Sequence, residues 1–231
     1  EMELFIGRAA DKIEGLEKYL TNDKDGFLKR LTDAGYDFND IGEYLYAQHA
    51  EERNDHIQEN VNPENEKGSG ITTEKADEIL AEYGPDMEAL ANEFREEVLT
   101  PMLELRYKSG FIDKDLYETY KEQFDYYVPL KSTKKNTSFR MRGKGYSVTH
   151  RGIFRAKGRS SVADNPFVRT IMDYEDVIVS SEKNKVGKAF LEFVRKHDSS
   201  MWDVGGRHKL PVFNKHGEME GIRNRSQLTE R

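Results

Sequence analysis

The densest group of ionisable side chains in the sequence lies between His49 and His56. If this stretch is helical, His49, Glu52 and His56 stand at positions i, i+3 and i+7 and face the same side. Imidazoles beside a carboxylate are common general acid–base groups, which makes hydrolysis one candidate chemistry. The same three residues are also candidate metal ligands.

A metal ion shared by both histidines is excluded by distance. At about 1.5 Å of rise per residue, His49 and His56 lie roughly 10 Å apart along a helix, too far for two ligands of one ion. One histidine with Glu52 could still bind a metal, although the order is the reverse of the Glu-x-x-His found in di-iron bundles. We expect no metal and no cofactor here. Instead, we interpret His49, Glu52, Arg53 and His56 as a buried or interfacial polar network, because buried charges are tolerated where they satisfy one another.

The second group with a chemical use is basic. Between residues 126 and 163 the chain has ten basic residues and no acidic one. These are Lys131, Lys134, Lys135, Arg140, Arg142, Lys144, Arg151, Arg155, Lys157 and Arg159. Phe139 and Tyr146 lie among them as candidate stacking residues. Cations for phosphates and aromatic rings for bases are the composition of a non-specific nucleic-acid binder. The alternative, that this segment packs on acidic helices of the same or a neighbouring chain, stays open.

Other catalytic motifs do not reach their required spacing. The sequence contains no cysteine, which excludes disulfides, cysteine-ligated metals and thiol nucleophiles. Residues 23–26 resemble the start of a calcium loop, but Thr32 stands where the bidentate Glu is needed. Gly143 and Gly145 lack the spacing of a phosphate-binding loop. We therefore predict that the chain is not an enzyme.

The elements that must position these residues are predicted to be mainly helical. Apolar residues at a spacing of three to four predict helices over about residues 2–20, 27–35, 39–60, 72–84, 85–110 and 113–120. Asn39 or Asp40 is expected to cap the third helix, and Pro101 to kink the fifth. Asn165 and Pro166 begin a further helix or helix pair, whose apolar stripe lapses over residues 180–185. Short apolar runs at 210–213 and 219–222 favour a small C-terminal β-hairpin.

Composition and charge suggest how these elements are organised. Hydrophobic residues make up 36% of the 231, which predicts a thin core and an elongated multi-helix assembly. We divide the chain into an acidic helical domain (1–125), a basic irregular arm (126–163), a long helix or helix pair (164–200), and a short β-hairpin with a linker to a following domain (201–231). The first 125 residues carry a net charge of −18 and the rest +11. This asymmetry points to a polyanionic partner or to contact between the two halves.

Several short motifs resemble a segment of the large polyvalent proteins of tailed phages. They are residues 44–54 (YLYAQHAEERN) followed by Ile57, residues 68–72 (GSGIT), 127–130 (YVPL), 158–161 (GRSS) and 182–187 (EKNKVG). Together they span about residues 40–195. Proteins of this kind are very long multidomain chains, often carried in the virion and delivered with the DNA. The resemblance carries no catalytic residue onto this segment and implies a helical connecting or structural domain.

The first hypothesis for function combines these observations. We expect a non-catalytic structural or interaction domain of a phage virion-associated or co-injected polyprotein, located in the virion or in the host cytoplasm after delivery. Its expected partners are other domains of the parent polyprotein or virion proteins. The alternative is a nucleic-acid-binding module that uses residues 131–159 on DNA or RNA. A chain that starts at Glu1 without an initiator Met fits a piece of a longer protein, and no apolar run is long enough for a membrane span.

Overall fold

The protein is described by a computed structural model that covers residues 4–130, 158–159, 161–197, 202–213 and 219–230. It is mainly helical, as predicted. The helices are α1 (Phe5–Thr21), α2 (Phe27–Asp33), α3 (Phe38–Asn60), α4 (Thr73–Ala81), α5 (Pro85–Phe94), a π-helix η1 (Arg95–Leu99), α6 (Thr100–Lys108), α7 (Lys114–Gln123) and α8 (Pro166–His197). Strands β1 (Trp202–Phe213) and β2 (Met219–Glu230) pair antiparallel. No helix within these ranges is both long and apolar enough to cross a membrane.

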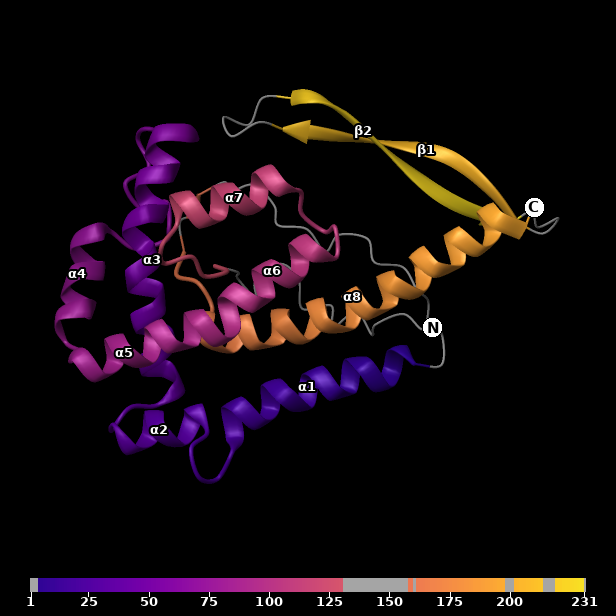
Figure 1. Ribbon diagram of the computed structural model, residues 1–231. Coiled ribbons are helices and arrows are strands. Elements are labelled where there is room, and N and C mark those ends of the chain that lie inside the picture. The colour runs from indigo at the N-terminus through magenta and orange to yellow at the C-terminus, as the bar shows by residue number, and fades with distance from the viewer. Residues whose placement is uncertain (1–3, 131–157, 160, 198–201, 214–218, 231) are drawn as a thin grey trace.

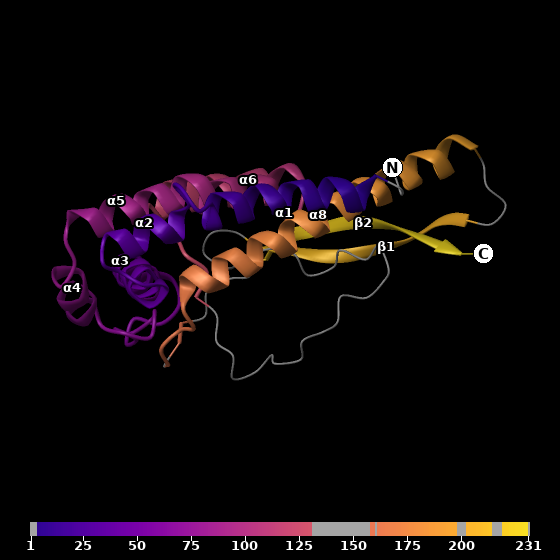
Figure 2. The same ribbon diagram turned by 90° about the horizontal axis from the view of Figure 1, so that it is seen from below.

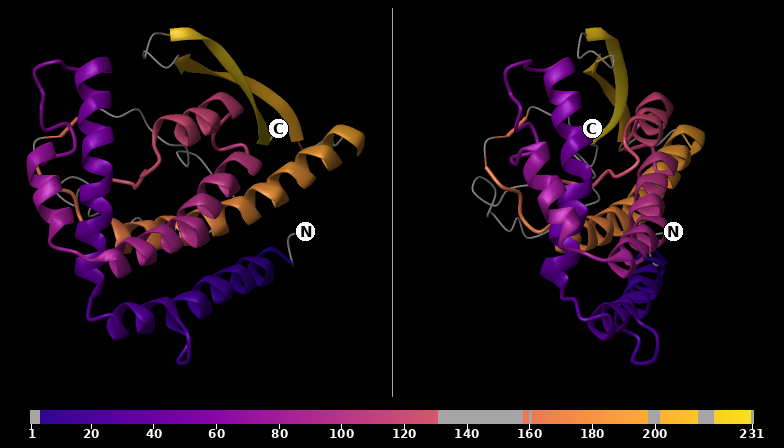
Figure 3. Two further views of the ribbon diagram at one scale, coloured as in Figure 1. Left: turned by 60° about the vertical axis from the view of Figure 1, so that its left-hand side comes forward. Right: turned by 90° about the vertical axis from the view of Figure 1, so that its left-hand side faces the viewer.

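Three long helical elements lie alongside one another, and α3 crosses them. Figure 1 shows α1, the α5–α6 run and α8 along similar directions. Figure 2, seen from below, shows the same three elements side by side. In both views of Figure 3 the helix α3 stands steeply across their ends, with α4 next to it. The helix with the ionisable residues is therefore held at the end of the assembly.

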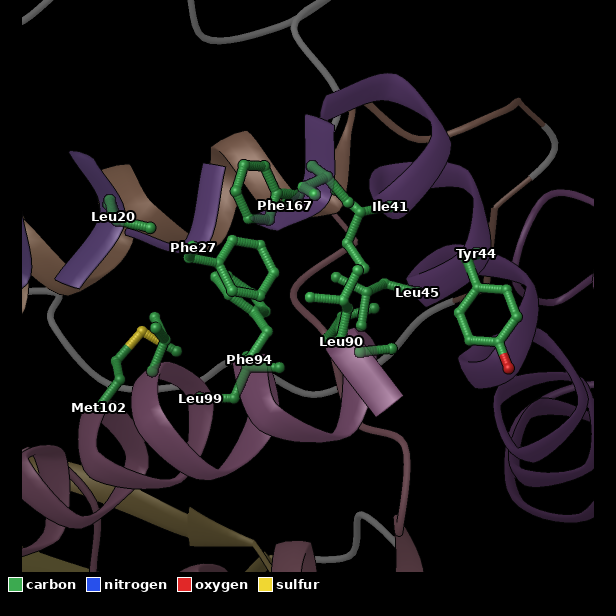
Figure 4. Close-up of a cluster of buried hydrophobic side chains, with 14 of the residues drawn as sticks. Leu20, Phe27, Ile41, Tyr44, Leu45, Leu90, Phe94, Leu99, Met102 and Phe167 are labelled. Atoms are coloured by element: carbon green, nitrogen blue, oxygen red, sulfur yellow. The ribbon is translucent and has the colours of Figure 1, made fainter. Parts of the chain in front are cut away.

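The main core forms where these elements meet. The ring centroids of Phe27 and Phe94 lie 5.6 Å apart, and Phe167 lies 5.7 Å from the first and 4.7 Å from the second. Figure 4 shows Phe27, Phe94 and Phe167 beside Ile41 and Leu45 of α3. All five side chains are buried. Helix α8 thus contributes to the same core as the helices of residues 1–125, while the predicted domain boundaries stay predictions.

Helix α3 begins at Phe38, and its N-cap lies two residues before the earliest cap predicted, Asn39. Asp37 is the N-cap: its side chain accepts hydrogen bonds from the backbone N–H groups of Asn39 (2.6 Å) and Asp40 (3.1 Å). The carboxylate of Asp40 accepts the N–H of Asp37 in return at 2.7 Å. This reciprocal capping box satisfies backbone donors that would otherwise lack partners, so the prediction of Asn39 or Asp40 as cap was wrong. Thr72 and Asp113 are the N-caps of α4 and α7.

The helical run from Pro85 to Lys108 is irregular just before its proline. The sequence predicted a kink at Pro101, and the structure has a π-helix over Arg95–Leu99, in the turn that precedes it. Proline has no N–H, and its ring crowds the carbonyl four residues earlier, here that of Glu97. A wider turn around Glu97 relieves this crowding.

Helix α8 is continuous through residues 180–185, where the lapse of the apolar stripe left either one helix or a helix pair. The first half of its polar turn is buried: Ser180, Ser181 and Glu182 are each at most 3% exposed. The Glu182 carboxylate accepts hydrogen bonds from Arg8 (2.7 Å) and Lys12 (2.6 Å) of α1. It also accepts one from Lys185 (2.7 Å) of its own helix. Charges from α1 thus cover the first half of this turn, while Lys183 and Asn184 are partly exposed and Lys185 is exposed.

The two remaining predicted elements are described only in part. Residues 131–157 and 160 of the basic arm lie outside the described residues, while residues 126–130, 158–159 and 161–163 lie within them. The hairpin expected around residues 210–222 stays a prediction.

Candidate functional site

The polar face of α3 is the candidate site, and His49 is its most buried member. The side chain is 1% exposed, and its Nδ1 lies 3.4 Å from Oε2 of Glu52. The rings of Phe124 and Tyr127 meet the imidazole edge-on, each with its centroid 5.6 Å away. Burial lowers the pKa of His49 below its ordinary value, and the charges of Arg53 and Arg95 act in the same direction. The ring is therefore neutral at pH 7.

Glu52 binds the chain that follows α7. Its Oε1 accepts the backbone N–H of Asp125 at 2.9 Å and that of Tyr126 at 3.3 Å. Its Oε2 lies 3.2 Å from the same Tyr126 nitrogen. Both carboxylate oxygens thus accept hydrogen bonds from two successive peptide groups. Such charge-assisted bonds fix the position at which the chain leaves α7 and enters residues 126–130.

His56 is the third residue of the polar face of α3, and its ring also packs against Phe124. Its ring centroid lies 5.5 Å from that of Phe124, almost the same separation as for His49. Asn60 donates a hydrogen bond to the backbone carbonyl of His56 at 3.1 Å. The three residues predicted to share a face are therefore brought together, and Phe124 lies between the two imidazoles.

Arg95 of the π-helix contacts the side chain of Tyr126, whose backbone N–H binds Glu52. Its guanidinium carbon lies 4.6 Å from the ring centroid of Tyr126, a cation–π contact. The same group donates to Asn92 at 2.7 Å and to the side-chain oxygen of Gln48. Arg95 is 9% exposed. Sequence reasoning missed Phe124, Tyr126 and Arg95, although five aromatic residues between positions 117 and 127 were a usable signal.

The far end of the basic arm returns to the same helix. The backbone N–H of Arg159 donates to the carbonyl of Gly68 at 3.1 Å. Gly158 has a φ of +71°, and an added Cβ there would lie 2.8 Å from the Asn65 amide and 3.2 Å from Ile57. A side chain at 158 would therefore be strained and crowded. The first end of the arm is therefore bound to α3 at Glu52, and the second to the loop that follows α3, at Gly68 beside Ile57.

The predicted cationic and stacking residues fall unevenly on the structure. Arg159 is described; its Nη2 donates to the carbonyl of Val162 at 3.0 Å. The other candidates lie outside the described residues: Lys131, Lys134, Lys135, Arg140, Arg142, Lys144, Arg151, Arg155 and Lys157, with Phe139 and Tyr146. Their use in binding stays a prediction.

The candidate site contains two histidines, His49 and His56, but they are not part of a group of metal ligands among the described residues. Within the residues that the structure describes, no three His, Cys, Asp or Glu side chains are grouped as a metal ion would require. Comparisons with protein-family models, with curated proteins and with solved structures give no match to this chain.

Proposed function

We propose that this chain is a non-catalytic helical interaction domain in which α3 and the loop that follows it hold the two ends of the basic arm. The observation that carries this proposal is the engagement of Glu52, whose two carboxylate oxygens accept the N–H groups of Asp125 and Tyr126. A general base needs a free lone pair directed at a substrate proton. Glu52 instead holds backbone, and His49 is enclosed between aromatic rings.

The proposed partners and setting come from the sequence. The resemblance of residues 40–195 to large polyvalent phage proteins supports a place in a virion-associated or co-injected polyprotein. Other domains of that polyprotein, or virion proteins, are then the proposed partners. The proposed location is the virion, or the host cytoplasm after delivery.

The change in the free energy of unfolding on replacing Glu52 tests whether this residue has a structural or a catalytic role. Glu52→Ala should lower the free energy of unfolding by about 1 kcal/mol, because two N–H groups lose a charged acceptor while water still reaches them. Catalytic residues tend instead to cost stability, so their removal commonly raises it. Urea unfolding followed by circular dichroism measures the difference.

Glu51→Ala is the matched control, since Glu51 is the exposed neighbour of Glu52 on the same helix. It should leave stability nearly unchanged. A Glu52→Ala variant that is as stable as the parent, or more stable, would contradict the proposal.

A second candidate function, nucleic-acid binding, is favoured by the charge of the arm between its two anchors. Residues 131–159 contain all ten basic residues of the arm and no acid. If five cations meet phosphates, the affinity for a single strand should fall with salt at a log–log slope of about −3.5. The affinity should depend little on base sequence.

Two variant sets separate charge from stacking. Arg140, Arg142 and Lys144 changed together to Ala should flatten the slope, because fewer counterions are released. Phe139 and Tyr146 changed to Ala should weaken binding and keep the slope, because stacking releases no ions. Lys24, Lys67 and Lys75 changed to Ala give a control with the same loss of charge. No binding of a labelled single strand at low salt would reject this candidate.

A further inference from the structure

Two arginines with buried, unbonded nitrogens lie together over one face of α3. Arg53 belongs to α3, and Arg159 lies where the chain returns to it after the basic arm. Gly158, next to Arg159, packs against Ile57, one helical turn beyond Arg53. Arg159 is also close enough for its charge to act on both Tyr46 and Arg53. Arg159 therefore enters on the side of α3 that carries Arg53 and Ile57.

The hydrogen-bonding capacity of this pair is largely unused. In the described part of the chain, Nε of Arg53 and both Nε and Nη1 of Arg159 are buried without a hydrogen-bond partner. Only Nη2 of Arg159 has one, the Val162 carbonyl. Buried N–H groups are nearly always satisfied in folded proteins, and an exception calls for an explanation such as a bound ion.

The charge of the pair is also uncompensated. Burial lowers the pKa of Arg53, and the positive charge of Arg159 lowers it further. The groups that act in the opposite direction are the phenols of Tyr120 and Tyr127, which are neutral. None of the ion pairs among described residues joins a carboxylate to Arg53 or Arg159. Two like charges held together without an acid are unfavourable unless an anion joins them.

We propose that Arg53 and Arg159 form a binding site for a phosphate group. A tetrahedral oxyanion offers several acceptors at once, and guanidinium groups bind it through paired N–H donors. The phosphate can belong to a free phosphate or phosphomonoester, or to a nucleic-acid backbone. The second source rests on the second candidate function above.

Inorganic phosphate is the first probe. The full chain should bind it saturably, measured by calorimetry and by the thermal midpoint in phosphate against chloride at equal ionic strength. Arg53→Met and Arg159→Met should each weaken phosphate binding by about tenfold or more, because a charged donor is lost.

The stability of Arg53→Met without phosphate provides a second readout. Because this change removes an uncompensated buried charge, the variant should be as stable as the parent in chloride, or more stable, and should lose the phosphate-dependent rise. Lys24→Met is the control: it removes an exposed charge far from the pair and should keep the rise. The proposal is overturned if phosphate does not bind saturably, or if Arg53→Met responds to phosphate as the parent does.

A twelve-residue oligothymidylate separates the two sources. If it displaces phosphate in the parent chain, the site takes a backbone phosphate; if both bind together, the site takes a free phosphate or monoester. Phosphate binding without any oligonucleotide binding would reject the nucleic-acid candidate and leave this site standing. The opposite result is oligonucleotide binding that Arg53→Met and Arg159→Met do not alter, together with no phosphate binding. It would reject this phosphate site and leave the nucleic-acid candidate standing.

Discussion

Replacing Glu182 by Gln should reveal how much α1 depends on one buried carboxylate. Glu182 is 0% exposed and accepts hydrogen bonds from Arg8, Lys12 and Lys185. Burial by itself raises the pKa of Glu182, but the bonds from Lys12, Lys185 and Arg8 outweigh it, so that the pKa falls from 4.5 to about 2. The native fold therefore favours the ionised form strongly.

The size and pH range of the effect follow from this shift. A pKa lowered by about 2.5 corresponds to about 3 kcal/mol in favour of the folded state. Because the folded pKa is the lower one, this contribution is complete above pH 4.5 and is lost as the pH falls towards 2. Glu182→Gln should thus lower the free energy of unfolding by about 3 kcal/mol at pH 7, and the difference should shrink below pH 4.5.

Urea unfolding at pH 7, 5 and 3 measures this difference. Glu14→Gln is a control in the same contact region: Glu14 of α1 pairs with Lys18 at 2.6 Å but is 60% exposed. Exposed pairs contribute little, so this variant should unfold like the parent. Equal urea midpoints for Glu182→Gln and the parent at pH 7 would refute the reasoning, as would a difference that is unchanged at pH 3.

Two further predictions concern α3. His49→Ala should lower the free energy of unfolding by about 1–3 kcal/mol, because Phe124 and Tyr127 lose a packing partner. Since the folded pKa of His49 is below 6.5, the parent should lose stability as the pH falls below 6.5, and the variant should lose less over pH 7 to 5 in urea titrations. Asp37→Ala should cost about 1 kcal/mol through the lost N-cap, measured by thermal unfolding, whereas Glu59→Ala at the exposed end of α3 should cost less. An Asp37→Ala variant as stable as the parent would contradict the capping assignment.

The sequence predicted the helices well where apolar spacing and caps act locally. The stripe that includes Ile41 and Leu45 places α3, and Thr72 begins α4, because these signals depend on neighbours three or four residues away. It failed at Glu182, whose partners Arg8 and Lys12 lie 174 and 170 residues earlier. Spacing along one helix cannot show that a distant helix will cover a polar turn.

The candidate site could be predicted only on the side that belongs to a single helix. His49, Glu52 and His56 share a face because of helical geometry alone. Phe124 and the backbone of residues 125 and 126 pack against that face. The spacing of residues on α3 cannot predict that a backbone N–H group is the partner of Glu52. The pairing of Arg53 with Arg159 likewise depends on the return of the chain beside Gly68.

The link between α1 and α8 also has a consequence for the order of folding during synthesis. The Arg8–Glu182 bond joins residues 174 positions apart, so α1 leaves the ribosome long before its ionic partner exists. At roughly 5 to 20 residues per second, this delay is about 10 to 35 s. During it Arg8 and Lys12 have no buried acceptor to bind, and the N-terminal helix can dock fully only after residue 182 has emerged. The fold can therefore be completed only after the C-terminal part of the chain has been synthesised.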